Sequence, residues 1–557
     1  MLNSIQYKKN MKTYLRTAKV SLLIAVMLVG SCTNNFEEIN NDPNRASDVQ
    51  PTGILTQAQR WIAYDYYDSW QGLRMNGVIS QAWVQRTYTE EDRYDFSARL
   101  GTIANFFNLT YRISELLNQI IAINESNPDA DGFGETNMQI ASVRILKAWL
   151  MFQNVQTYGD VPYTEANDVF TYPTPKYDKQ DFIYKDLIRE LKECNTMLQG
   201  VSRGWTSGDV ILNGSPEGWR RFANSLRLRI AMRISNADPS FSSTEAAAAI
   251  ADGVMESNAH NAVFRFRGAG SPNESSKYNT FLSRMDFIPS WQFVNLLHGR
   301  DDDNIGFKNP FNGIVDPRFI QFVLSPAAQA AGVDPPIYSP PIGLSGGDND
   351  NVWAILGPAS DDDPDLRISY GPTAGQSDNS LPRIVQASMW STFMDYPNTA
   401  FLISEHLGND RGYFKSAIEA SMEMWAVPED DASDYVDAIL AKFDAAATDE
   451  EKFEMLITQK YIHNFAHFDQ ECLFEYRRTE YPKSIVMPGQ QTGGEFEIAG
   501  ETVTFKFVPL PTAHASTFLH RHMYPNTEAS FNKESLQEAI TSMGGDTQLI
   551  KLYYAKK

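Results

Sequence analysis

The thiol of Cys32 lies where a bacterial envelope protein can carry a lipid. A basic segment at residues 8–19 precedes an apolar run from Val20 to Val29, and this run is too short to be a membrane span of ~20 residues. Residues 29–32, Val-Gly-Ser-Cys, have the pattern of a lipobox, in which the signal is cut before the Cys and its sulfur is acylated. We expect a lipidated Cys32; an ordinary secretory signal with an incidental Cys is the alternative. Met1 and Met11 are both possible starts.

A second set of side chains could bind a sugar or a peptide without reacting with it. Trp and Tyr rings stack on the apolar C–H face of a pyranose, and Asn side chains hydrogen-bond its hydroxyls. Such residues recur in two loop-rich stretches, residues 64–94 and about 268–399. The candidates are Trp70, Trp83, Tyr88, Asn273, Tyr278, Trp353 and Trp390. Trp353 is the best single candidate because Gly, Asp and Asn surround it. Packing in the core is the alternative for each of them.

Metal-ligand side chains are present, but their patterns are incomplete. His463 and His467 lie four residues apart, yet Asn464 stands where a His-Glu-x-x-His zinc site has its Glu. Residues 301–304 and 348–351 carry oxygen ligands that calcium prefers, but neither segment follows the full EF-hand pattern. We therefore predict no metal site and no cofactor, and calcium in an acidic loop stays the open alternative.

Charge limits the partners of the chain. The 557 residues carry a net charge of −21, and without the five basic residues of the first 31 it becomes −26. Such a body lacks the basic patch that phosphate groups require, which argues against nucleic acid and anionic lipid surfaces. Among 69 Asp and Glu residues no pair stands out as the acid and base of a glycosidase. We do not expect an enzyme; a surface-anchored glycoside hydrolase is one alternative.

Helical periodicity dominates the elements that must position these side chains. Residues 141–155 place apolar side chains on one face, and Gly159 then ends the helix. Residues 215–216, Ser-Pro, suit the N-cap and first turn of another helix. A short alternation over residues 495–508 predicts a hairpin, and a last helix is expected over 533–542.

Two sets of reactive side chains have a structural interpretation. Arg227, Arg229 and Arg233 recur along one helix, and in so acidic a chain we interpret them as a solvated or ion-paired face rather than a ligand site. Cys194 and Cys472 lie in helical stretches and are expected to be free buried thiols. A disulfide between them is the alternative outside the cytoplasm.

The chain divides into a leader, a tether and one body. We expect a signal peptide over residues 1–31, a flexible lipidated tether over 32–50, and a single mainly α-helical domain over 51–557 with long loops and small β-hairpins. Its loop-rich ligand region covers about 268–399. Paired amphipathic helices favour packing of the tetratricopeptide kind, although no clean 34-residue repeat is present.

Six segments, in the same order along the chain, resemble the SusD/RagB family of outer-membrane lipoproteins. They are residues 35–44 (NFEEINNDPN), 158–163 (YGDVPY), 219–233, 459–461 with 475–479 (QKY and EYRRT), 521–528, and 544–552. Two details depart from the family pattern: Glu480 stands where Gly is usual, and Tyr553-Tyr554 replace a Trp pair.

The resemblance implies both a fold and a function. Members of this family are helical bodies with tetratricopeptide-like helix pairs on the outer face of the outer membrane. They associate with a TonB-dependent β-barrel transporter of the SusC type and capture oligosaccharides or peptides without catalysis. The resemblance therefore implies a non-enzymatic nutrient-binding lipoprotein, attached to the membrane through its lipid alone. A helical-repeat scaffold without a ligand is the remaining alternative.

Overall fold

The computed structural model describes Met11 and residues 49–556, apart from residues 87, 285, 334, 336–338, 340, 345–371, 499–500 and 511–514. Cys32, Trp353 and the acidic segment 348–351 lie outside the described residues. Pro51–Lys557 forms one compact unit. Within the described ranges, no helix combines the length and apolarity needed to cross a membrane.

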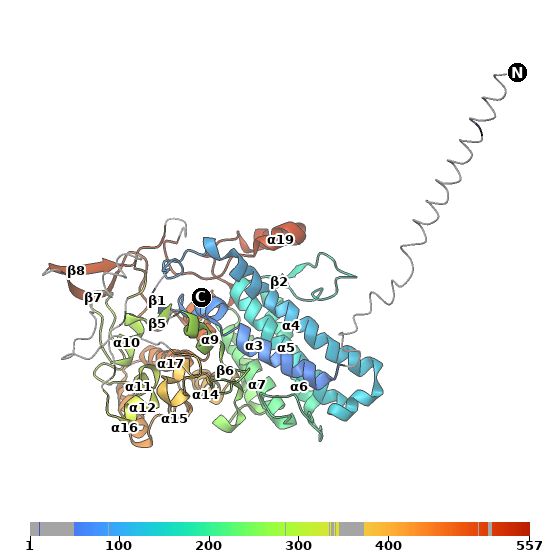
Figure 1. Cartoon of the computed structure of the whole chain (residues 1–557), viewed down its shortest axis with the longest axis horizontal. Helices are drawn as coiled ribbons and strands as arrows, with labels where there is room; N and C mark the ends of the chain where they lie inside the picture. Colours follow the sequence, from blue (N-terminus) through green and yellow to red (C-terminus); the bar gives the residue numbers. More distant parts are fainter. Residues whose placement is uncertain are drawn as a thin grey trace. The chain divides into compact units, whose positions relative to one another are not determined.

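Long helices in consecutive contact form the first half of this unit. They are α3 (Pro51–Asp65), α4 (Leu100–Ser126), α5 (Thr136–Tyr158), α6 (Gln180–Leu198), α7 (Pro216–Arg233) and α8 (Pro239–Ala251). Each packs against the next along the chain, and Figure 1 shows α4, α5 and α6 side by side. This is the mainly α, tetratricopeptide-like architecture that the helical periodicity predicts.

The second half mixes short and long helices. In chain order they are α9 (Ser276–Ser283), α10 (Trp291–Leu297), α11 (Arg318–Val323), α12 (Pro326–Ala330), α14 (Tyr396–His406), α15 (Arg411–Met424), α16 (Glu429–Ala445), α17 (Asp449–Asn464), α18 (Asp469–Thr479), α19 (Asn526–Phe531) and α20 (Lys533–Met543). The π-helix η1 (Ser69–Gly77) and short 3-10 helices complete the helical elements: η2 (Ser97–Arg99), η3 (Pro128–Phe133), η4 (Asn258–His260), η5 (Asp378–Ser380), η6 (Arg383–Val385) and η8 (Tyr553–Ala555). The region from 268 to 399 thus holds α9 to α12 where the sequence indicated loops.

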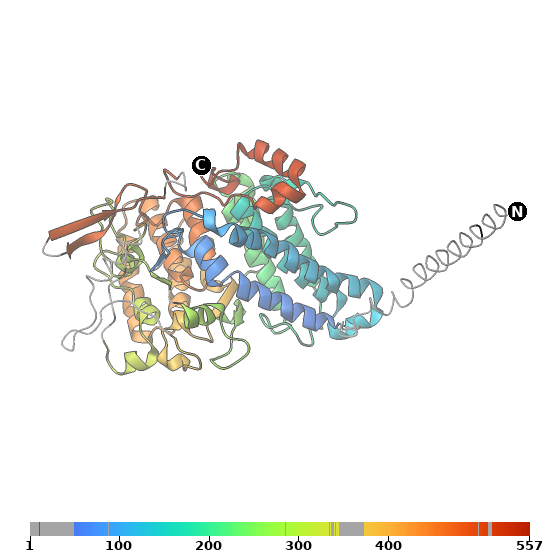
Figure 2. The same cartoon turned by 45° about the horizontal axis from the view of Figure 1, so that its top comes forward.

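The described strands form four antiparallel pairs. They are β1 (Trp83–Gln85) with β5 (Phe287–Pro289), β2 (Val161–Pro162) with β3 (Tyr177–Asp178), β4 (Ala262–Arg265) with β6 (Trp390–Met394), and β7 (Gln491–Ile498) with β8 (Glu501–Lys506). The pair β7–β8 is the hairpin expected near residues 495–508, and Figure 2 shows it projecting from the edge of the helical body. The pair β1–β5 joins segments that are far apart in the sequence.

Local signals account for the ends of several helices. Gly159 follows α5 with φ +100°, a conformation that favours glycine. The Ser215 hydroxyl accepts a hydrogen bond from the amide of Gly218 at the start of α7, as an N-cap does. The apolar pattern over residues 453–476 is divided, because Ala466 takes φ +69° between α17 and α18.

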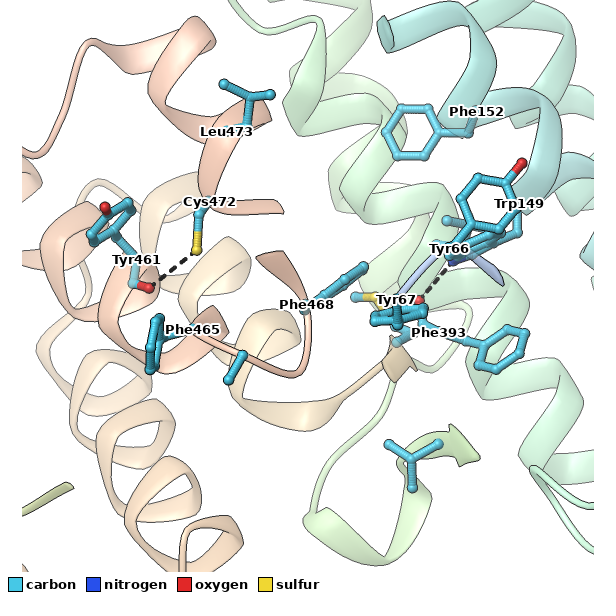
Figure 3. Close-up of a cluster of buried hydrophobic side chains, with 14 of the residues drawn as sticks. Tyr66, Tyr67, Trp149, Phe152, Phe393, Tyr461, Phe465, Phe468, Cys472 and Leu473 are labelled. Atoms are coloured by element: carbon cyan, nitrogen blue, oxygen red, sulfur yellow. Dashed lines mark hydrogen bonds between the residues drawn. The ribbon is translucent and has the colours of Figure 1, made fainter. Parts of the chain in front are cut away.

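An aromatic core lies where the two halves meet. Trp149 and Phe152 of α5 face this core from one side, and Phe465, Phe468 and the α18 side chains face it from the other (Figure 3). The Trp149 indole donates a hydrogen bond of 2.9 Å to the Phe393 carbonyl on β6. The two halves therefore share one continuous core.

Buried ion pairs also join the halves, which corrects one part of the sequence interpretation. Arg227, Arg229 and Arg233 are all buried, so the alternative of a solvated face is wrong, whereas ion pairing is confirmed for two of them. Arg233 of α7 reaches Glu471 at 2.6 Å and Glu475 at 2.5 Å, both on α18. Apolar neighbours on α7 carry these arginines into the core, where acidic side chains of other helices neutralise them.

The two thiols inside the body behave as expected. Cys194 and Cys472 are free and buried. Burial raises the pKa of both thiols, that of Cys194 to about 12. Both therefore stay protonated and unreactive at neutral pH.

Candidate functional site

The pairing of β1 with β5 brings together two distant parts of the chain. Trp83 lies opposite Pro289 and Gln85 opposite Phe287, and the ladder continues because the Arg86 amide donates to the Asp286 carbonyl at 2.7 Å. Just before β1, the π-helix η1 is tied to α9 through Ser69 and Thr280, whose hydroxyls are 3.1 Å apart. π-Helical turns are frequent at functional sites, and this one carries Trp70.

Trp70 presents one ring face to solvent. Its side chain is 51% exposed, and the Arg74 guanidinium carbon lies 4.1 Å from the ring centroid. Arg74 itself is buried, and its Nε lies 3.3 Å from the Glu91 carboxylate. A planar guanidinium stacked in this way holds an aromatic ring in place and adds cation–π attraction. Trp70 is therefore an exposed platform with a fixed orientation.

Tyr88 repeats this arrangement on the other side of Asp286. Its side chain is 52% exposed, and the guanidinium carbon of Arg284 lies 4.6 Å from the ring centroid. Arg284 reaches the Asp286 carboxylate at 3.0 Å, and Arg74 approaches the same oxygen at 3.8 Å. The hydrogen bond that Arg284 donates to the Asp286 carboxylate raises the pKa of Arg284. One buried carboxylate thus links the two arginine–aromatic pairs, and we name Trp70, Arg74, Tyr88, Arg284 and Asp286 the aromatic–arginine surface.

The backbone of Tyr88 is left-handed, with a φ of +62°. This conformation costs a non-glycine residue about 1 kcal/mol. The buried residues Gln81 and Tyr94 share it, so the strain alone does not distinguish an exposed ring from a packed one.

Polar side chains continue the surface along α3. Tyr64 is half-buried beside Asn279, and Arg60 lies 5.3 Å from the Tyr64 ring centroid. Arg60 also donates through Nε to Asn273 Oδ1 at 3.3 Å. Burial raises the pKa of Asp68, which caps η1, to about 7. These groups can give or accept hydrogen bonds beside the exposed rings.

Three of the candidates from the sequence lie in the core. Trp83 is fully buried and donates its indole N–H to Asp469 at 2.8 Å. Tyr278 is buried and its hydroxyl donates to the Thr373 carbonyl at 3.0 Å. Trp390 is 8% exposed and its ring centroid lies 5.1 Å from that of Trp425. Burial favours the packing alternative for all three, whereas Trp70 and Tyr88 are about half exposed and Asn273 contacts Arg60 of α3.

Sequence reasoning missed the charged half of this surface. Arg74 could have been found, because it follows Trp70 by four residues and so lies above it on a helix. No sequence signal placed Arg284 or Asp286 beside them, because that contact depends on the β1–β5 pairing.

A group of metal-ligand side chains is present in the core, but its atoms are already engaged. Asp395, His463 and His467 lie within 4.8 Å of one another and are buried. His463 contacts Ser421 and Asp395, while His467 contacts Thr392 and the His463 carbonyl. Burial lowers the pKa of His467 to about 3, so its ring is neutral. These hydrogen bonds explain how both imidazole rings can be buried in the core.

The surface suits recognition more than catalysis. Two ring faces can stack on a sugar or an apolar side chain, and the arginines and amides around them can hydrogen-bond hydroxyls or carbonyls. Two of its acids are ion-paired: Asp286 is held by Arg284, and Glu91 by Arg74 and Arg99. Asp68 instead accepts a hydrogen bond from the Gln71 amide and has a raised pKa.

Comparison with known proteins identifies relatives for almost the whole body. Residues 43–497 match the SusD-like family described as "Starch-binding associating with outer membrane". No curated protein matches the chain.

Several solved structures share the fold. A chitin-binding protein superposes with a TM-score of 0.66 at 23% identity, covering 91% of this chain and 100% of its own. A chitin-binding SusD homologue from Flavobacterium johnsoniae gives 0.63 at 20% identity, with 90% and 97% coverage. A SusD homologue from Bacteroides fragilis gives 0.61 at 18% identity, with 92% and 100% coverage.

Proposed function

The chain belongs to the SusD-like family, and from this premise we propose that it captures oligosaccharide or peptide nutrients at the outer face of the outer membrane. It delivers them to a TonB-dependent β-barrel transporter of the SusC type. The description of the family as starch-binding and associated with the outer membrane supports the location and the ligand class. Two of the similar structures carry chitin-binding names, which makes β-linked glycans candidates beside starch.

The observation that carries this proposal is the aromatic–arginine surface. Trp70 and Tyr88 are both about half exposed, although most large aromatic side chains of the described residues are buried. Each ring lies under an arginine that Asp286 helps to orient. Rings held in place lose little entropy when a ligand binds, which favours affinity. Asn273 on the neighbouring segment can hydrogen-bond a sugar hydroxyl or a peptide group.

Alanine variants test the surface directly. The body from residue 51 onward is titrated calorimetrically with maltoheptaose, chitohexaose and a tryptic peptide pool. We expect one class to bind, and Trp70→Ala and Tyr88→Ala each to weaken it about tenfold, as the loss of an interface aromatic does. Phe531→Ala is the matched control, because Phe531 is 77% exposed and lies far along the chain on α19. If binding is unchanged in both variants, the ligand site lies elsewhere on the body. If the body binds none of the ligands, the scaffold alternative is favoured.

The anchor and the partner belong to the same proposal. A lipid on Cys32 holds the body at the membrane, and the acidic residues of the body leave the lipid as its only attachment. Membranes solubilised in detergent should yield the chain together with a large β-barrel protein. Recovery of the chain alone, or of Cys32 without acyl groups in mass spectrometry, would contradict this part.

We propose that capture proceeds without catalysis. A glycosidase needs an acid and a second carboxylate on either side of the scissile bond. Asp68, whose pKa is raised, could serve as the acid, but Asp286 and Glu91 are both committed to arginines. The purified body should release no reducing ends from starch or chitin during prolonged incubation. Release that persists in Asp286→Asn would favour the hydrolase alternative at another site.

A further inference from the structure

A cavity at the C-terminal end of α18 shares no lining residue with the aromatic–arginine surface. It has a volume of about 370 Å³, which is within the range of small-molecule sites. Its lining comes from three parts of the chain: the end of α18 with the segment that follows it, the residues around Phe518, and Lys551 near the C-terminus. We name this space the α18 cavity.

The α18 cavity is cationic in an otherwise acidic protein. Arg477, Lys483 and Lys551 line it, and Glu480 is the one carboxylate among its lining residues. Lys551 pairs with Glu480 at 3.0 Å. Among the described residues, no carboxylate lies within ion-pair distance of Arg477 or Lys483. Net positive charge in a chain of net charge −21 makes this cavity a place where an anion is favoured.

Arg477 adds buried hydrogen-bond donors. It is 1% exposed, and its Nε donates to the Leu519 carbonyl at 3.0 Å. Nη1 and Nη2 have no acceptor in hydrogen-bond geometry among the described residues. The Tyr554 hydroxyl donates its own proton to the Gln156 carbonyl, and its oxygen faces this guanidinium; burial lowers the pKa of Arg477, and Tyr554 acts in the opposite direction. A buried guanidinium without a carboxylate is costly, and an anion nearby would offset that cost.

His520 reports the same positive potential. Its Nδ1 is buried without a hydrogen-bond partner among the described residues, and its ring lies 6.2 Å from that of Phe518. Burial, together with Arg477 and Lys551, lowers the pKa of His520 to about 4, while Glu480 acts in the opposite direction. The imidazole is therefore neutral at pH 7 and can itself offer a hydrogen bond.

The walls between these charges are apolar. Tyr476, Phe518, Ile485 and Met487 complete the lining. A simple inorganic anion would leave these side chains unused. A carboxylate attached to a small body with an apolar face would use both the charges and the walls.

We propose that the α18 cavity binds a carboxylate carried on a small, partly apolar body. The carboxylate of a uronic acid residue and that of a peptide C-terminus share this chemistry. Lys483 and Lys551 meet the carboxylate at the mouth, and Arg477 supplies the buried positive charge behind them. This site is separate from the aromatic–arginine surface and does not depend on the function assigned to it.

Glu480 is the residue that sets the strength of this site. It caps α18 with φ +63° and ψ +28°, a left-handed conformation that favours glycine, and it stands where the SusD/RagB pattern usually has Gly. Its carboxylate occupies Lys551 and so competes with a carboxylate ligand for the same ammonium group. Neutralising Glu480 should therefore strengthen binding.

Calorimetry with paired ligands tests the proposal on the body from residue 51 onward at low ionic strength. D-Glucuronate is compared with D-glucose, and N-acetylphenylalanine with its uncharged amide. We expect a carboxylate to bind and its uncharged partner not to bind. The double substitution Lys483→Met and Lys551→Met should weaken binding about tenfold, because it removes two charged donors. Glu480→Gln should strengthen it about threefold, and Trp70→Ala should leave it unchanged.

A second readout separates binding in the cavity from binding elsewhere. NMR titration of the His520 ring should show its pKa rising when the carboxylate is present, because the added negative charge offsets Arg477 and Lys551. Binding of only one carboxylate supports the proposal and identifies the source. The proposal is overturned if neither carboxylate binds, if the uncharged partners bind equally well, or if His520 and the lysine double variant show no response.

Discussion

Replacing Arg233 by Met should cost this protein much of its stability, although the residue touches no proposed ligand. Arg233 of α7 lies 2.6 Å from Glu471 and 2.5 Å from Glu475 of α18, and all three side chains are at most 4% exposed. The substitution fills most of the same space but leaves the two carboxylates in the core. The ion pairs between Arg233 of α7 and the two glutamates of α18 are then lost.

The expected loss can be worked out from the remaining partners. Glu475 keeps Arg478 at 2.7 Å and Lys460 at 3.1 Å. Among the described residues, Glu471 keeps only Lys460 as an ion-pair partner, at 3.7 Å. Removing one partner of a buried ion pair costs about 3–5 kcal/mol. Since one of the two carboxylates stays well paired, we expect a loss near the lower end, about 3 kcal/mol.

Urea unfolding followed by circular dichroism measures this loss. Arg189→Met is the matched control, because Arg189 is 52% exposed and contacts three carboxylates, and an exposed arginine should contribute at most about 1 kcal/mol. The double variant Arg233→Met with Glu471→Gln should recover about half of the loss, because it removes the unpaired charge. Equal losses for Arg233→Met and Arg189→Met, or no recovery in the double variant, would refute the reasoning.

Three further outcomes follow from buried and reactive groups. Burial raises the pKa of Asp68 to about 7, so the folded state holds this proton more tightly than the unfolded state and stability falls as pH rises from about 4 to 7. In urea titrations Asp68→Asn should reduce the loss of stability between pH 4 and 7 by up to roughly 4 kcal/mol, at about 1.4 kcal/mol per pKa unit; an unchanged pH dependence would show that other groups cause it. Cys194 and Cys472 should react with Ellman's reagent only after unfolding, and fast reaction of the native body would contradict their burial. Cys32→Ala should move the mature protein from the membrane fraction to the soluble fraction on immunoblots, and retention in the membrane would point to another attachment.

Local patterns predicted much of the fold. The periodicity over residues 141–155 matches α5, the Ser-Pro pair at 215–216 starts α7, and the last helix covers Lys533–Met543. These features depend on residues within one or two turns of each other. The short helices between 268 and 399 were missed, because their turns are too short to show a period and are stabilised by packing.

The candidate site was only half predictable. Trp70 and Tyr88 were selected by residue type, but the same criterion selected Trp83, Tyr278 and Trp390, which are buried. Composition cannot separate a displayed ring from a packed one, since both are apolar and both occur near loops. Only the tertiary structure shows which face of each ring meets solvent.

The sequence by itself determined the family and the helical architecture, and it predicts a lipid on Cys32, because motifs, periodicity and caps depend on neighbouring residues. The tertiary structure alone decided that Arg74, Asp286 and Arg284 hold the two exposed rings, and that Arg477, Lys483 and Lys551 meet around one cavity. Such contacts join segments from distant parts of the chain. They form only when the helices and the β1–β5 pair have packed, so no local pattern of residues can encode them.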